Sequence, residues 1–353
     1  MAQPIENWVP TYVNESHIKL GIEHCFDGKI PSAGDTLWVE VLHTFPDTTS
    51  PVKLVRFNNQ GITEIAVLKL YDRTHPGRLR KFAAPSLLAE REYRSWKTYD
   101  PQDAIDYVSY DRENADFPYF VRERFEAGVW FEFDRRHKTE SRAYAQLQSI
   151  QGTKIPRLYA NVRIPLSFID RGWKANPEEE EFLCVPGILL QYYDCRKLSE
   201  LRLPGMVHVE SGELRVMWAG LAQRTVDAIH EINRFGIVLR SYNNNAIFRI
   251  ENGNDEPYII DFAEALFKED LIEAWIKALR ERRGLLAATE YPPWQREVGY
   301  WEMVKVYRNP QSIAEAFFIQ FSKCALPDYP TIIKGITLQA LGGASQNTQT
   351  SGE

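Results

Sequence analysis

The stretch "TLWVEVLHTFPDTTSPVKLVRFNNQGITEIAVLKLYD", residues 36–72, decides the fold class of the first half of the chain. Apolar and polar residues alternate over 36–45, 51–57 and 62–72, which is the period of strands with one buried face. The turns "PDTTS" and "NNQG" are short, so consecutive strands must run antiparallel. We predict an antiparallel sheet that follows an irregular segment, residues 1–33, containing the turn formers of "DGKIPSAGD".

The composition is that of an ordinary soluble globular protein. The chain has 353 residues, of which 44% are hydrophobic and 25% charged, enough for one large domain or two lobes. A net charge of -6 disfavours nucleic-acid binding, which requires clustered positive charge. The sequence has no signal-peptide pattern, no long apolar run and no metal-binding cysteine spacing. We expect an intracellular, cytoplasmic protein with neither nucleic acid nor membrane as a partner.

Helical and extended patterns alternate over the rest of the chain. A charged, aromatic stretch over about residues 79–134 is predicted to be a long insertion with one helix, "SLLAEREYRSWKTY". Another helix, "TESRAYAQLQSI", is expected to begin at the N-cap residue Thr139. The strands "KIPRLYANVRI" and "VPGILLQYYD" follow. Beyond them the sequence is mostly helical, and its longest helical period ends at Gly236, a residue type common at helix C-termini.

The order of strands, helix, strands and then helices predicts an α+β protein with two lobes. We place an N-terminal β-sheet lobe over residues 34–190 and a helical C-terminal lobe over residues 191–338. The small, polar segment 339–353 is predicted to be disordered.

Lys69 is a charged residue within an apolar strand. In "EIAVLKLYD" both faces of the strand are apolar except at the acidic ends and at this lysine. Its ammonium group should therefore lie in or beside a partly buried site, and it needs an anionic partner to offset the loss of hydration. The alternative is a strand-end lysine whose long side chain reaches water.

Two glutamates could supply that partner. Glu140 is expected in the first turn of the helix that starts at Thr139, where the helix dipole favours an acid. Tyr144 and Leu147 share its helix face and would pack that side against a core. Glu92 competes with Glu140, because no spacing rule excludes it. The structural alternative for Glu140 is a first-turn glutamate on the protein surface.

Asp261 ends the apolar run "YIID" and is followed by "FAEA". A carboxylate at the end of a buried strand is well placed to hold a divalent cation, because Mg²⁺ and Ca²⁺ prefer oxygen ligands. The structural alternative is an aspartate that caps a helix or a turn.

Taken in order, these segments resemble the protein-kinase-like superfamily, and within it a divergent kinase-like group from filamentous fungi. The resemblance covers roughly residues 35–270 and is carried by "VLKLYDR", "AYAQLQSIQGTKIPRLYA", "GILLQYYD" and "GIVLRSYNNNAIF…IIDFAEA". No segment is specific alone, and the resemblance rests on their number and order. It implies a bilobal kinase-like fold with ATP and Mg²⁺ as ligands.

The resemblance also assigns roles to residues. Lys69 matches the lysine that holds the α- and β-phosphates in kinases, and Glu140 matches the helix glutamate that positions it. Asp261 matches the metal-binding aspartate, in a "DFA" motif where Ala263 replaces the usual glycine. The gatekeeper and the three hinge residues whose backbone meets adenine correspond, in order, to Leu190, Gln191, Tyr192 and Tyr193.

The catalytic loop departs from the kinase pattern. Arg240 and Ser241 fall on the last two positions of the His-Arg-Asp motif, so the catalytic base is missing. The second metal ligand falls on Ala246. A frame shifted by one residue brings Asn245 to that position, but then Arg240 occupies the base position. The turn that should carry a glycine-rich phosphate loop reads "TFPDTTSPV" and contains no glycine.

These departures favour a catalytically impaired kinase fold, a pseudokinase that still binds ATP and Mg²⁺ through Lys69, Glu140 and Asp261. General-base catalysis contributes about 10²–10⁴ to a rate, and positioning and charge stabilisation supply more of phosphoryl transfer. An active, atypical phosphotransferase acting on a protein or a small molecule is the alternative, with Asp227 or Glu264 as the base. A scaffold without a nucleotide site is the third reading, and the sequence names no protein partner.

Overall fold

In a computed structural model, the chain folds into two compact units. The first unit comprises Met1–Ser141 and Arg157–Tyr192, and the second comprises Arg142–Pro156 and Tyr193–Glu353. Both units contain helices and strands, so the predicted α+β class is confirmed. The structure describes residues 12–46, 48–75, 78–80, 83–86, 89, 92, 96, 98–109, 121–165, 182–200, 211–240, 246–251, 254–283 and 292–322.

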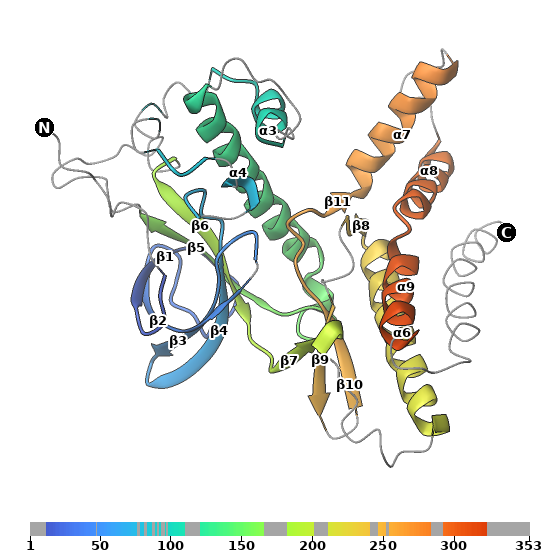
Figure 1. The fold of residues 1–353 in the computed structure, drawn as a ribbon, viewed down its shortest axis with the longest axis horizontal. Coiled ribbons are helices and arrows are strands. Elements are labelled where there is room, and N and C mark those ends of the chain that lie inside the picture. The colour runs from blue at the N-terminus through green and yellow to red at the C-terminus, as the bar shows by residue number, and fades with distance from the viewer. Residues whose placement is uncertain are drawn as a thin grey trace, which may run out of the picture. The chain divides into compact units, whose positions relative to one another are not determined.

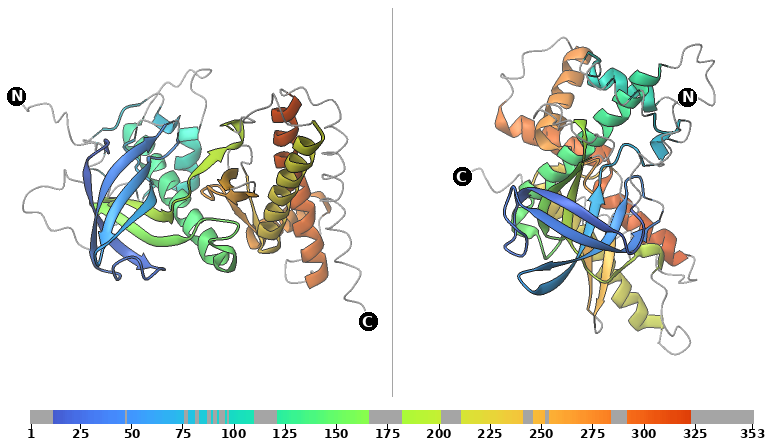
Figure 2. Two further views of the ribbon diagram at one scale, coloured as in Figure 1. Left: turned by 90° about the horizontal axis from the view of Figure 1, so that it is seen from below. Right: turned by 90° about the vertical axis from the view of Figure 1, so that its left-hand side faces the viewer.

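The first unit is built on a closed barrel of antiparallel strands in the order β1-β2-β3-β4-β6-β5 (Figure 1). The twisted strands β1 to β4 curve round one another in Figure 2. The strands are β1 (His17–Cys25), β2 (Thr36–Phe45), β3 (Val52–Asn59), β4 (Ile62–Leu70), β5 (Leu158–Pro165) and β6 (Cys184–Gln191). Alternate side chains fill the interior and are fully buried, among them Leu20, Val39, Val55, Leu68, Val162 and Leu189. The meander predicted from the sequence is therefore present as β2, β3 and β4.

Strand β1 corrects the prediction that residues 1–33 are irregular. Ile18, Leu20 and Ile22 are buried in the barrel, and the residues between them are exposed or half-buried. β1 pairs with β2 on one side and with β5 on the other. It therefore closes the sheet and leaves no free edge. The pairing with β5 is distant in sequence, so no local pattern announces it.

Helix α4 (Arg122–Gln146) corrects a second prediction. It begins inside the stretch assigned to an insertion, about five turns before the expected start at Thr139. Apolar side chains of these early turns are buried, and this packing extends the helix beyond the local capping signal. The buried residues are Phe125, Ala127, Val129, Trp130 and Phe133.

The segment between β4 and α4 packs onto the early turns of α4. It includes η1 (Arg78–Arg80) and α3 (Pro101–Ser109). A Cβ atom at Gly128 would lie 2.2 Å from the carbonyl oxygen of Ala104, so only glycine lets α3 approach α4 this closely. Most of the helix predicted in "SLLAEREYRSWKTY" lies outside the described residues.

The second unit combines four described helices with two small sheets. The helices are α6 (Ser211–Arg234), α7 (Lys268–Arg283), α8 (Pro293–Val306) and α9 (Asn309–Ser322), with the short turns η3 (Gln148–Ile150) and η4 (Leu198–Glu200). The sheets are β10-β9-β7 and β11-β8. Their strands are β7 (Cys195–Lys197), β8 (Ile237–Val238), β9 (Ala246–Glu251), β10 (Asn254–Ile259) and β11 (Leu266–Phe267).

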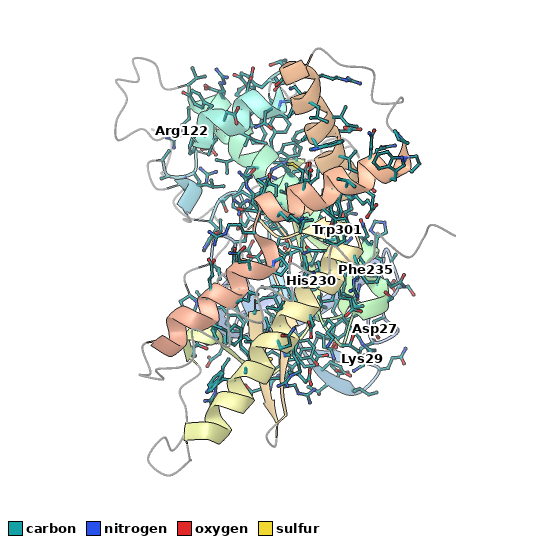
Figure 3. All side chains as sticks on the ribbon, turned by 90° about the vertical axis from the view of Figure 1, so that its right-hand side faces the viewer. Asp27, Lys29, Arg122, His230, Phe235 and Trp301 are labelled. Atoms are coloured by element: carbon teal, nitrogen blue, oxygen red, sulfur yellow. The ribbon has the colours of Figure 1, made fainter. Side chains whose placement is uncertain are left out.

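Helices α6 and α9 lie side by side (Figure 2). As predicted, α6 ends just before Gly236, whose φ of 79° is the left-handed conformation that glycine adopts at helix ends. His230 and Phe235 mark this end of α6 in Figure 3, and Trp301 marks α8. Helix α6 coincides with the predicted helix that ends at Gly236, and β10 with the strand predicted before Asp261. Helices α7, α8 and α9 lie in the region that was predicted to be mostly helical.

No helix in the described ranges is long and apolar enough to cross a membrane. Cys25 and Cys195 form no disulfide. The predicted disordered tail, 339–353, lies outside the described residues.

Candidate functional site

Lys69 lies on the outer face of the barrel. Ala66, Leu68 and Leu70 of β4 are fully buried inside the barrel. Val67 and Lys69 alternate with them, so they face outward and are half-buried. The lysine side chain is 12% exposed, and the predicted partly buried ammonium is confirmed.

Glu140 is the partner of Lys69. The Nζ atom of Lys69 donates a hydrogen bond to Oε2 of Glu140 at 2.6 Å. The carboxylate side chain is 0% exposed, so the structure decides for Glu140 over Glu92. An ionised carboxylate this deeply buried is tolerated only where charged or polar donors replace its water.

The predicted place of Glu140 in a first helical turn is wrong, because α4 begins at Arg122. Glu140 lies near the other end of α4, where the positive end of the helix dipole contributes nothing to its charge. Side chains hold the charge instead. The Tyr71 hydroxyl donates to the same Oε2 atom that accepts from Lys69. Sequence reasoning missed Tyr71, although it lies two residues beyond Lys69, the spacing that repeats one face of a strand.

His137 packs against the ring of Tyr71, with ring centroids 5.2 Å apart. Burial lowers the pKa of His137 from 6.5 to about 4, while a hydrogen bond with the Gly187 backbone opposes the shift. The imidazole is therefore neutral at pH 7 and adds no positive charge beside the carboxylate of Glu140.

The strand register places apolar residues beside Lys69. Val52 of β3 and Ile188 of β6 flank the lysine directly. The next outward-facing row of the barrel consists of Leu54, Val67 and Leu190. Val52, Leu54 and Val67 are half-buried, so part of this apolar surface is open. An apolar surface that ends at an ammonium group suits a ligand with a flat apolar ring joined to an anion.

The three predicted hinge residues lie where the chain passes from one unit to the other. The first unit ends at Tyr192 and the second begins at Tyr193. The backbone N–H of Gln191 donates to the carbonyl of Arg157 at 2.9 Å. The ring centroids of Tyr193 and Tyr258 lie 4.2 Å apart. Adenine binding by the backbone of these residues stays a prediction.

Asp261 follows β10 in the second unit. Its φ is 65°, a left-handed conformation that non-glycine residues rarely adopt. Its side chain is exposed, whereas Phe262 and Ala263 are buried. The ring of Phe262 packs edge-on against Tyr144, with centroids 5.4 Å apart. The exposed Asp261 thus lies just after β10, at the position predicted for a metal-binding carboxylate, and this role stays a prediction.

Two predicted site residues, Ser241 and Asn245, lie outside the described residues. Arg240 and Asp227 are described, and both side chains are exposed. Ala246 begins β9 and offers no metal ligand. Among the residues that the structure describes, no three His, Cys, Asp or Glu side chains gather as a metal site. Mg²⁺ does not need such a cage, since it commonly binds one or two carboxylates together with phosphate oxygens and water.

No model of a known protein family matches the chain, and no curated protein matches it. Among solved structures, it is similar to the Rio2 kinase–ADP/Mg²⁺–phosphoaspartate complex from Chaetomium thermophilum, with 14% identity, 86% of this chain and 70% of that chain covered, and a TM-score of 0.31. It is similar to WaaP in complex with acyl carrier protein, with 11% identity, coverage of 85% and 87%, and a TM-score of 0.30. The PknI kinase domain of Mycobacterium tuberculosis has 13% identity, coverage of 84% and 99%, and a TM-score of 0.31.

Proposed function

We propose that this chain is a kinase-like protein of the divergent filamentous-fungal group, and that it binds ATP with Mg²⁺ but is impaired in phosphoryl transfer. The observation that carries the proposal is the buried pair between Lys69 on a barrel strand and Glu140 on α4, at 2.6 Å. The resemblance in sequence expects this pairing of a strand lysine with a helix glutamate. Lys69 and Glu140 are thus the two residues that the resemblance pairs and the two that are in contact.

The outer face of the barrel has the chemistry that a nucleotide needs. The ammonium of Lys69 binds phosphate oxygens, since Lys acts as a compact point charge for phosphates. The adenine ring lies on the half-buried surface of Val52, Leu54 and Val67. The hinge backbone contributes polar contacts to the ring edge.

Asp261 supplies the Mg²⁺ ligand in this proposal. Its exposed carboxylate and left-handed backbone support the assignment. The metal ion neutralises phosphate charge when it is bound. One protein carboxylate suffices for it when phosphate oxygens complete the coordination.

Catalytic impairment rests on the sequence of the catalytic loop. Ser241 stands where a kinase carries its aspartate base, and Ala246 stands at the second metal ligand. Serine at neutral pH accepts a proton poorly, and alanine cannot ligate a metal. The chain therefore binds ATP without efficient phosphoryl transfer, because it keeps the binding residues Lys69, Glu140 and Asp261 but lacks the catalytic base.

Thermal unfolding of the full chain with and without ATP and Mg²⁺ tests the proposal. At a ligand concentration about a hundred times Kd, binding should stabilise the chain by roughly 2.7 kcal/mol. The variant Lys69→Met should lose this stabilisation. Lys19→Met is the matched control, because Lys19 is an exposed lysine on another barrel strand, and it should keep the full shift.

Absence of a shift at millimolar ATP with Mg²⁺ would leave only a scaffold and overturn the proposal. A phosphotransfer assay tests the impairment separately. ATP-dependent phosphorylation of a protein or a small molecule that disappears in Asp261→Ala would identify an active, atypical phosphotransferase instead.

A further inference from the structure

Tyr71 has a fixed place next to the Lys69–Glu140 pair and no role in the resemblance to kinases. It follows β4 directly, is 2% exposed, and its backbone N–H donates to the carbonyl of Pro186 at 2.8 Å. Its ring lies 5.6 Å from the Lys69 ammonium. Backbone and ring are thus both held before any ligand arrives.

The Tyr71 hydroxyl and the Lys69 ammonium share one acceptor atom. Both donate to Oε2 of Glu140, and the ammonium does so at 2.6 Å. A carboxylate that is 0% exposed cannot recruit bulk water to replace a lost donor. Whatever weakens its contact with the ammonium must therefore be compensated by the groups already around it.

A bound phosphate would weaken that contact. An anionic oxygen near the Lys69 ammonium draws the charge and the hydrogen-bond donors of the ammonium toward itself. The buried carboxylate then depends more on its other donors, among them the Tyr71 hydroxyl. A hydrogen bond to a charged acceptor is among the stronger ones in proteins. His137, whose ring centroid lies 5.2 Å from that of Tyr71, is neutral at pH 7 and supplies no compensating charge.

We propose that Tyr71 is a positioning residue for a triphosphate ligand: its hydroxyl holds Glu140 so that Lys69 can turn toward phosphate oxygens. This inference rests on the proposed function and deepens it. Tyr71 does not touch the ligand and acts only through Glu140. It therefore affects affinity for phosphate-bearing ligands and leaves adenosine, which lacks phosphate, unaffected.

The test measures the Kd of ATP with Mg²⁺ for the full chain and for Tyr71→Phe, Glu140→Gln and the double variant. Tyr71→Phe should weaken ATP binding about tenfold, the effect of one hydrogen bond to a charged group. In the Glu140→Gln background the same change should weaken binding less than about twofold, since coupled residues are not additive. Equal losses in both backgrounds would overturn the inference.

Tyr12→Phe is the matched control. The Tyr12 hydroxyl also donates to a buried carboxylate of the same unit, Oδ2 of Asp72, at 3.1 Å. Its removal should cost stability but leave the Kd of ATP unchanged. Loss of ATP affinity in Tyr12→Phe equal to that in Tyr71→Phe would show a general structural effect and overturn the inference.

Replacement of Tyr71 by p-aminophenylalanine keeps a donor at the same place on the ring and should restore the affinity of the natural chain. This variant also carries the test if Tyr71→Phe does not fold, and a tenfold loss of ATP affinity in it would overturn the inference.

Failure of the proposed function gives a different result. In that case the natural chain binds no ATP, or Lys69→Met binds as well as the natural chain. If Lys69→Met loses ATP affinity and Tyr71→Phe does not, the inference about Tyr71 is overturned and the proposed function stands.

Discussion

The regions around Lys69 and around Asp261 keep a charged group in opposite ways. In the first unit, Glu140 is fully buried and its charge is held by the ammonium of Lys69 and the hydroxyl of Tyr71. In the second unit, Asp261 is exposed on a left-handed backbone. The first charge is part of the folded core and cannot be removed without cost. The second lies on a backbone conformation that costs free energy in its own unit, and we propose a ligand-binding role for it.

The early turns of α4 reinforce the first region with another buried ion pair. Arg80 contacts Glu126 at 2.5 Å, with side chains 1% and 0% exposed. The backbone N–H of Ser86 also donates to Glu126, at 3.2 Å. Two buried carboxylates therefore fix helix α4, Glu126 in its early turns and Glu140 near its C-terminal end.

The largest expected effect is the loss of this second pair. Glu126→Ala leaves the Arg80 guanidinium buried without its carboxylate, and the free energy of unfolding should fall by about 3–5 kcal/mol. Urea denaturation measures it. Glu40→Ala is the control, because the Arg56–Glu40 pair is exposed, at 47% and 25%, and should cost less than about 1 kcal/mol. Equal losses would show that the early turns of α4 are not an anchored core.

A smaller effect is expected from the protonation of His137. Its pKa is about 4 in the folded chain against an ordinary value of 6.5. The unfolded chain therefore binds more protons between these values, and stability falls as the pH drops through this window. The loss is on the order of 3 kcal/mol.

Thermal unfolding between pH 7 and about pH 4 measures this loss. Because carboxylates also titrate in that range, the readout is the difference between the natural chain and His137→Gln. The variant should show a flatter dependence, whereas His17→Gln, at an exposed position of β1, should follow the natural chain. A slope in His137→Gln equal to that of the natural chain contradicts the prediction.

The smallest expected effect sharpens the contrast at Asp261. Asp261→Gly removes the left-handed strain and should stabilise the chain without ligand by about 1 kcal/mol. It should also remove the Mg²⁺-dependent part of the stabilisation by ATP. Gln60→Gly is the control, because Gln60 has a φ of 53° on the exposed β3–β4 turn. It should gain similar stability and keep the ligand effect, and a full ligand effect in Asp261→Gly would exclude Asp261 as the metal ligand.

Local sequence patterns were sufficient for several elements of the fold. The alternation over residues 36–72 predicted three strands and a partly buried place for the ammonium group of Lys69. Gly236 marked the end of α6. These features depend on backbone period and on the conformational preference of one residue type, and both are properties of a short segment.

Other features depend on contacts between distant segments. The β1–β5 pairing closes the barrel, and burial of aromatic side chains extends α4 to Arg122. The Tyr71 hydroxyl on Glu140 was missed for the same reason. Each feature depends on which surfaces come into contact when the chain folds. From local sequence alone, β1 could equally be an irregular segment, α4 could begin later, and Tyr71 could be an ordinary core residue.

The sequence by itself therefore determined which residues carry charge within apolar surroundings, and in what order along the chain. Only the tertiary structure decided that Glu140 and not Glu92 pairs with Lys69, and that the Tyr71 hydroxyl donates to the same Oε2 atom of Glu140. Burial is the physical reason. The energy of a charge depends on how much water surrounds it and which donors replace that water, and both are set when the chain packs.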